Sequence, residues 1–120
     1  MEKVILIVED NELLRKGMRY TLGREFQVDE AINGSQGVAA YVELKPDLVL
    51  MDNEMPVMDG IEAIESIMKI DPNAKIIMLS GSIDPNVKAS ALAAGAKEFV
   101  TKGGKPPEVL LEVIKRLLEE

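Results

Sequence analysis

Three short, uninterrupted apolar runs constrain the fold of this chain more than any other feature of its sequence. They cover residues 4–8, 48–51 and 76–79, consist mainly of Val, Ile, Leu and Met, and stop at polar residues. A strand with one face in solvent alternates polar with apolar residues, whereas a strand covered on both faces of a parallel sheet is apolar throughout. The runs therefore predict three interior strands of a parallel sheet.

Two further segments have the weaker pattern of strands at the edges of a sheet. Residues 26–31 alternate, with Phe26 and Val28 apolar and Gln27 and Asp29 polar, and residues 98–101 contain a short apolar pair. Alternation is typical of a strand that is buried on one face only. These segments are expected to be the second and the fifth strand along the chain.

Segments with apolar residues at helical spacing separate the strands, and most begin at a residue that can cap a helix. In the second of these segments Val38, Ala39 and Val42 are expected to share the buried face. The fourth is rich in Ala and has only Val87 and Leu92 as large apolar residues, which predicts a weakly anchored helix and a candidate moving part. The expected helix starts are Asn11-Glu12, Ser35, Asp59, Asp84-Pro85 and Pro106-Pro107.

Five strands that alternate with five helices predict an α/β fold with a doubly wound parallel sheet. Apolar strands belong in the interior and the alternating strands at the edges, which gives the order 2-1-3-4-5 of a flavodoxin-like (βα)5 domain. At 120 residues the chain fits one domain, residues 1–120. Ligands of such sheets bind beyond the carboxyl ends of the strands, at the switch point between strands one and three.

Composition narrows the chemistry that the chain can perform. There is no Cys and no His, so thiolate chemistry, Cys-based zinc sites and the most common general base are excluded. The net charge of −7 argues against direct binding of nucleic acid. The first apolar run is too short for a signal peptide or a membrane span, so we expect a cytoplasmic protein without membrane contact.

Polar residues at the ends of the predicted strands form a candidate site. Glu9, Asp10 and Asp52 are expected to converge within ~5 Å, where each like-charge pair repels by roughly 3 kcal/mol at an effective dielectric constant near 20. A hard cation such as Mg²⁺ relieves this repulsion. Lys102 balances further charge, Ser80 offers a hydroxyl, and a carboxylate beside the cation can attack a phosphoryl group.

With these positions in place the chain resembles the receiver domain of two-component response regulators, of the chemotaxis-regulator type, over essentially its whole length. The resemblance rests on Glu9-Asp10 after the first strand, Asp52 at the start of Asp-x-x-Met-Pro-x-Met-Asp-Gly, Ser80-Gly81, and Lys102 shortly after Phe99. Five coordinated positions are far more specific than any one of them.

The resemblance implies a role for each matched residue. Asp52 would accept the phosphoryl group, and Ser80 and Lys102 would hold its oxygens. Phe99, together with Ser80, would act as the switch that reshapes the face formed by the fourth helix, the fifth strand and the fifth helix. Mg²⁺ or Mn²⁺ would be bound by the carboxylates of Glu9, Asp10 and Asp52 and the backbone carbonyl of Glu54.

The same resemblance implies partners. The phosphodonor would be a sensor histidine kinase or a phosphotransfer protein. The output would be a downstream protein or a fused output domain. A dimer that forms on phosphorylation is also compatible with the resemblance. The domain would not be a conventional enzyme, but it would catalyse its own Mg²⁺-dependent phosphorylation and its autodephosphorylation at Asp52.

Two residues depart from the family pattern. Gly103 follows Lys102 where the family usually has Pro, which predicts a looser loop around Lys102. Ser80 stands where Thr is more common, and its unbranched side chain predicts a less sharp switch.

Two alternative functions stay open at the level of the sequence. One is a receiver-like docking module that no longer switches, for which Gly103 is the only support. The other is a toprim-type Mg²⁺-dependent nuclease or phosphotransfer domain built on Glu9, Asp52 and Glu54, which the net charge of −7 disfavours. FMN binding is excluded because the first loop is acidic where phosphate needs backbone donors.

Overall fold

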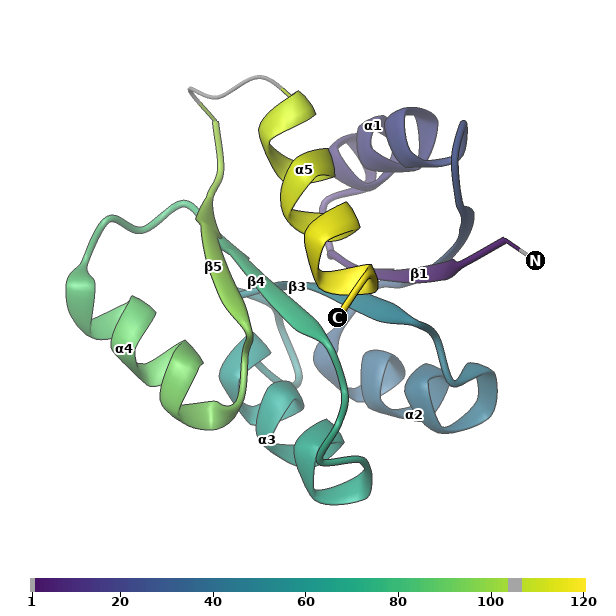
Figure 1. The fold of residues 1–120 in the computed structure, drawn as a ribbon. Coiled ribbons are helices and arrows are strands. Elements are labelled where there is room, and N and C mark those ends of the chain that lie inside the picture. Colours follow the sequence, from purple (N-terminus) through teal and green to yellow (C-terminus); the bar gives the residue numbers. More distant parts are fainter. Residues whose placement is uncertain (1, 104–106) are drawn as a thin grey trace.

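The computed structural model describes residues 2–103 and 107–120, which form five strands that alternate with five helices. All strand pairs are parallel and the order is β2-β1-β3-β4-β5, as the sequence predicts (Figure 1). The strands are β1 (Val4–Val8), β2 (Gln27–Ala31), β3 (Leu48–Asp52), β4 (Ile76–Ser80) and β5 (Glu98–Thr101). The helices are α1 (Glu12–Leu22), α2 (Gly34–Leu44), α3 (Gly60–Ile70), α4 (Pro85–Ala94) and α5 (Pro107–Leu118).

The sheet is the middle of three layers. Helices α1 and α5 cover one face, and α2, α3 and α4 cover the other (Figure 1). Successive residues of the central strands point to opposite faces, so that Leu50 packs under α1 and α5 whereas Met51 packs under α2 and α3. Every residue of β3 and β4 is buried, which explains why these strands are apolar runs rather than alternating ones.

Helix α2 differs from the prediction at its start and on its buried face. The N-cap is Asn33, whose side chain accepts a hydrogen bond from the N–H of Gln36, and Ser35 lies inside the helix. The buried residues of α2 are Gly34, Gly37 and Tyr41. Val38 is half-buried and packs against the core, whereas Ala39 and Val42 are exposed, so the predicted face is only partly buried.

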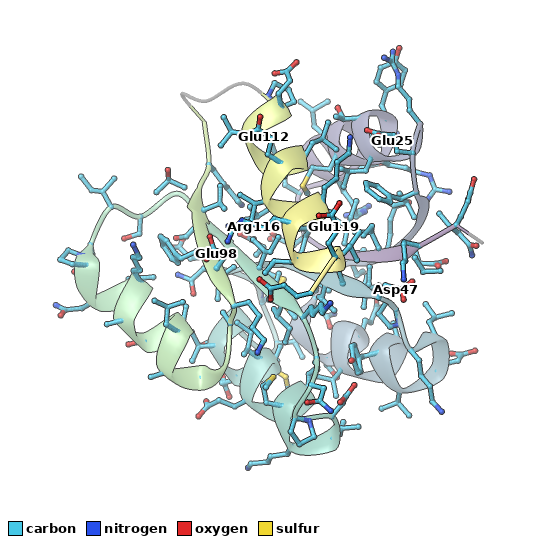
Figure 2. The ribbon with its side chains drawn as sticks, viewed as in Figure 1. Glu25, Asp47, Glu98, Glu112, Arg116 and Glu119 are labelled. Atoms are coloured by element: carbon cyan, nitrogen blue, oxygen red, sulfur yellow. The ribbon has the colours of Figure 1, made fainter. Side chains whose placement is uncertain are left out.

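Helix α5 is tied to the sheet by polar contacts in addition to its apolar face. Arg116 on α5 and Glu98 on β5 form an ion pair with 2.9 Å between Nη2 and Oε1 (Figure 2). Lys75, just before β4, donates to the carbonyl oxygen of Leu117 over 2.6 Å. Helix α5 begins at Pro107, and the expected Pro106 start lies outside the described residues.

The weak anchoring of α4 is confirmed. The helix begins after the N-cap Asp84 with Pro85 in its first turn and ends at Gly95, as predicted, but Ala91 is its only buried residue. Leu92 is 41% exposed. In the part of the chain that the structure describes, no helix has both the length and the apolar character that a membrane crossing needs.

Candidate functional site

The predicted site residues come together at the carboxyl edge of the sheet. Glu9 and Asp10 follow β1, Asp52 ends β3, Ser80 ends β4, and Lys102 follows β5. Because the strands are parallel, their carboxyl ends meet at one edge, and β1 and β3 are the neighbours at which the winding direction changes. The site therefore lies at the switch point that the sequence predicts.

The three carboxylates form a compact cluster. Glu9, Asp10 and Asp52 each offer an oxygen, and these oxygens lie within 4.8 Å of one another. Glu9 is 1% exposed and Asp52 4% exposed, whereas Asp10 faces solvent. Two buried acids and one open acid fit a hard divalent cation that takes a few carboxylates and keeps several water ligands.

Lys102 bridges the two buried acids. Its Nζ donates to Oδ1 of Asp52 over 2.6 Å and to Oε1 of Glu9 over 2.9 Å. Burial alone would lower the pKa of the Lys102 ammonium, but the hydrogen bonds and charges of Asp52 and Glu9 outweigh it and raise the pKa. Lys102 therefore remains a cation that directly neutralises the cluster.

Glu9 is a buried acid whose ionisation is opposed by its burial. Burial raises its pKa above the ordinary Glu value, and the negative charge of Asp52 adds to the rise. The hydrogen bonds from Lys102 and from the Asn11 N–H, which lies 3.2 Å from Oε2, work in the opposite direction. The two hydrogen bonds therefore favour the charged form of Glu9 against the effect of burial.

Lys102 itself is held at its backbone, although Gly103 follows it. The Lys102 N–H donates to the carbonyl oxygen of Ser80 over 2.7 Å, so the lysine is held at its backbone as well as at Nζ. Gly103 has a φ of 74°, a left-handed conformation that glycine adopts without strain and that proline cannot adopt. Gly104, Lys105 and Pro106, the remainder of the predicted loose loop, lie outside the described residues.

Ser80 is buried and Phe99 half-buried, and their roles as switch residues stay predictions. Ser80 is 1% exposed, and its Oγ accepts a hydrogen bond from the Ser82 N–H over 3.0 Å. Phe99 is half-buried and packs in the core on the side of α3 and α4. Glu54 is exposed in the loop after β3, and the role of its carbonyl oxygen remains a prediction.

The loop between β3 and α3 fixes Asp52 from the carboxyl side. The Asn53 N–H donates to the carbonyl oxygen of Leu79 over 3.1 Å, and the Gly60 N–H donates to the carbonyl oxygen of Asn53 over 2.9 Å. A Cβ on Gly60 would overlap the carbonyl oxygen of Asp52. Asp59 caps α3 as predicted, by accepting from the Glu62 N–H. The start of α3 is thus packed directly against the residue at the centre of the site.

Sequence reasoning missed one feature of this loop. Val57 has a φ of 75° and is 82% exposed, although a β-branched residue is strained in the left-handed region. The turn closes with a hydrogen bond from the Met58 N–H to the Pro56 carbonyl oxygen over 2.8 Å. A valine in a sequence gives no signal of such a conformation.

The fold and the site together define a class of protein. It is a doubly wound α/β domain whose switch point carries clustered acids that can bind a cation, a lysine and a buried hydroxyl. The comparisons with known proteins agree. The family model described as the response regulator receiver domain matches residues 5–115. The chain therefore belongs to the response regulator receiver domain family.

Relatives in this family are similar over nearly their whole length. The chain is 45% identical over 112 residues to the chemotaxis protein CheY of Thermotoga maritima, with 92% of this chain and 93% of the relative covered. It is 41% identical over 111 residues to the chemotaxis protein CheY of Halobacterium salinarum, with 92% of each covered.

Solved receiver structures superpose closely. A CheY-like receiver domain protein from Methanospirillum hungatei has a TM-score of 0.93 at 32% identity, covering 99% of this chain and 95% of that one. The response regulator TrrA from Thermotoga maritima, solved in complex with Mg²⁺ and a beryllium fluoride, has a TM-score of 0.86 at 34% identity, covering 96% and 98%. Membership of the receiver domain family excludes a toprim fold for this chain.

Proposed function

We propose that this domain is a phosphorylation-dependent signalling switch whose phosphoacceptor is Asp52. The observation that carries the proposal is the position of the Asp52 carboxylate, which is buried at the switch point, lies beside Glu9 and Asp10, and accepts a hydrogen bond from Lys102. Since the chain contains no His, the phosphohistidine that donates the group belongs to a sensor histidine kinase or a phosphotransfer protein.

In the proposed transfer an Asp52 carboxylate oxygen forms a bond to phosphorus while the bond between phosphorus and the donor nitrogen breaks, and the donor imidazole leaves with the electron pair. Glu9, Asp10 and Asp52 hold Mg²⁺, or Mn²⁺ in its place, which when bound neutralises charge on the phosphoryl oxygens. Lys102 supplies a second positive charge and leaves its bond to Asp52 for one to the phosphoryl group. In autodephosphorylation water attacks the same phosphorus, its bond to the Asp52 oxygen breaks, and inorganic phosphate leaves while the Asp52 carboxylate is restored.

We further propose that phosphorylation acts on the face made by α4, β5 and α5. Ser80 would move its hydroxyl toward the phosphoryl oxygens, and Phe99 would turn further into the space that this movement opens. The shallow burial of α4 supports this choice, because an element that buries one residue is displaced at low cost. The change in population is limited by how much better the phosphoryl group binds one conformation than the other.

The output of the switch is proposed by analogy with relatives. The chain is 37% identical to part of a protein-glutamate methylesterase of Hahella chejuensis and spans 31% of its length, so this type of domain occurs joined to an output domain. It also spans nearly all of the CheY relatives. We therefore propose either a separate partner protein or a fused output domain in the cytoplasm, and a dimer that forms on phosphorylation is compatible with both.

The metal part of the proposal is tested by thermal unfolding of the phosphate-free protein. Mg²⁺ is expected to raise the melting temperature by relieving the acid cluster, and Asp10→Asn is expected to remove most of that rise. Asp10 is the right residue to change because it is exposed, so its substitution leaves the core intact. An unchanged Mg²⁺ response in Asp10→Asn would exclude Asp10 as a ligand.

The phosphoryl part is tested by intact mass after incubation with acetyl phosphate and Mg²⁺. The expected result is a gain of one phosphoryl group that requires Mg²⁺ and disappears in Asp52→Asn. Asp47→Asn is the matched control, because Asp47 lies just before the opposite end of the same strand (Figure 2). Its side chain accepts a hydrogen bond from the Val4 N–H. No gain with either acetyl phosphate or a purified phosphohistidine donor would overturn the proposal in favour of a docking module.

A further inference from the structure

Arg15, on the first turn of α1, contacts the backbone that carries two of the three acids. Its Nη1 donates to the carbonyl oxygen of Glu9 over 2.9 Å and lies 3.5 Å from the carbonyl oxygen of Asp10. Its side chain is 14% exposed, so the guanidinium is held between the helix and the sheet. Arginine has several donors in a rigid, planar fork, which allows one side chain to bind several acceptors at once.

The acid loop needs such support because the sheet ends just before it. The pairing of β1 with β2 ends at Val8 and Ala31, and the Glu9 N–H donates to the Ala31 carbonyl oxygen over 3.0 Å. Asp10 lies one residue further on, between the strand and the N-cap Asn11. Arg15, which also bonds to Glu30 on β2, binds the carbonyl oxygens of this short segment.

Glu30 in turn orients Arg15. The Nε of Arg15 donates to Oε1 of Glu30 over 2.9 Å, while Arg19, one turn further along α1, donates from Nη1 to Oε2 over 2.6 Å. Arg19 is 53% exposed and has no bond to the Glu9 or Asp10 carbonyls. The two arginines therefore share one carboxylate, but only Arg15 connects it to the acid loop.

We propose that Arg15, oriented by Glu30, is a positioning residue for the cation site: it fixes the main chain of Glu9 and Asp10 so that both carboxylates face the cation. The inference rests on the proposed function, since it concerns the metal of that site. Its effect is positional because the charge of Arg15 is paired with that of Glu30. Partners that orient metal ligands commonly change affinity by 10–100-fold when they are lost.

The test is a calorimetric titration of the metal alone, Mg²⁺ or Mn²⁺, into the unphosphorylated protein. Arg15→Gln is expected to raise the Kd for the metal about tenfold, because the guanidinium is lost while the acids remain. This value is the low end of the 10–100-fold range. Arg15→Lys is expected to raise it by a similar factor, because lysine keeps the charge but cannot bind Glu30 and the carbonyl oxygens in the same geometry. Arg19→Gln is the matched control, with a Kd within about twofold of the wild type.

A second readout separates positioning from folding. The rate of phosphorylation by acetyl phosphate in Arg15→Gln should fall about tenfold at a Mg²⁺ concentration below the Kd and recover largely at saturation. If Arg15→Gln does not fold, Glu30→Gln, which leaves the arginine in place but loosens it, is expected to weaken metal binding severalfold.

Each alternative outcome overturns a defined statement. A wild-type Kd in Arg15→Gln, or in both Arg15→Lys and Glu30→Gln, would overturn the positioning role. An equal loss in Arg19→Gln would show that the arginines only anchor α1 and would overturn it too. Absence of metal binding by the wild-type protein would instead contradict the proposed function, while wild-type binding with unaffected Arg15 variants would leave that function intact.

Discussion

Helices α3 and α4 cover the same face of the sheet but are held there very differently. Helix α3 buries Gly60, Ala63, Ile64 and Ile67, and its first residue touches the backbone of Asp52. Helix α4 buries Ala91 alone, and Ile83 just before it is 90% exposed. Burial of large apolar side chains is the main source of local stability, so α3 belongs to the fixed part of the molecule and α4 to the part that opens at low cost.

The strands differ in burial in the same way as the two helices. All five residues of β3 and all five of β4 are buried, whereas all four residues of β5 are half-buried. The acids of the site follow β1 or end β3, and the predicted switch residue Phe99 lies on β5. The comparison teaches that the acids of the site are held by the well-buried part of the domain. A conformational response can occur in the less buried part, which contains α4 and β5.

The largest expected effect comes from a pair of glycines, one in each half. Gly60→Ala would force a Cβ into the carbonyl oxygen of Asp52, whereas a Cβ on Gly81, in the loop before α4, meets no atom within 4 Å. We expect Gly60→Ala to cost about 3 kcal/mol or more in free energy of unfolding and Gly81→Ala less than about 0.5 kcal/mol. Urea unfolding measures both, and equal costs would remove the contrast between the two helices.

A second pair compares apolar side chains on the two helices. Ile64→Ala in α3 removes a fully buried side chain and is expected to cost about 3 kcal/mol. Leu92→Ala in α4 removes a side chain that is 41% exposed and should cost less than about 1 kcal/mol. If chemical unfolding gave Leu92→Ala the larger cost, α4 would be anchored in a way that its burial does not reveal.

Lys102 connects the two halves, because it follows β5 and bonds to Asp52 at the end of β3 and to Glu9 just after β1. Lys102→Met leaves Glu9 and Asp52 buried without their counter-charge, and we expect a loss of about 2 kcal/mol in the metal-free protein. This figure is below the usual cost of breaking a buried pair because the Lys102 side chain is 28% exposed. Mg²⁺ should restore part of the loss, and a variant as stable as the wild type would contradict the bridging role.

The raised pKa of Lys102 predicts the direction in which the stability of the protein changes with pH. Its pKa is raised in the folded state, so its ion pairs contribute fully below the unfolded pKa and are lost as the pH rises through the folded pKa. The metal-free wild type should therefore lose this stability above about pH 10, and Lys102→Met should lack that part of the decline. Melting temperatures between neutral and alkaline pH measure it, and identical curves would contradict it.

The smallest expected effect is a gain. Asp52→Asn removes one of the three clustered charges and lowers the pKa of Glu9 toward its ordinary value, since the Asp52 charge is one cause of its rise. The variant also loses its bond from Lys102, so we expect a net stabilisation of only about 1 kcal/mol in the metal-free protein. A lower melting temperature would mean that the ion pair outweighs the repulsion.

Much of the fold could be predicted because its signals are local. Uninterrupted apolar runs identified the interior strands, and capping residues such as Asp59 and Asp84 marked the helix starts. The acids and Lys102 could be placed together because parallel strands bring their carboxyl ends to one edge.

The rest depends on tertiary contacts that no local pattern encodes. Asn33 rather than Ser35 caps α2 because both residue types cap helices and only the packing decides between them. Val57 adopts a left-handed backbone conformation that β-branched residues disfavour. Arg15 resembles any other basic residue on an amphipathic helix, and only the fold brings its guanidinium to the carbonyl oxygens of the acid loop.

Amide hydrogen exchange of α3 and α4 tests the central contrast most directly, first in the metal-free protein and then with Mg²⁺ and a beryllium fluoride as a phosphoryl mimic. The account predicts that α4 amides exchange at least about tenfold faster than those of α3 in the first state, and that the mimic changes exchange mainly in α4 and β5. Equal protection of the two helices, or a change centred on α3, would contradict it.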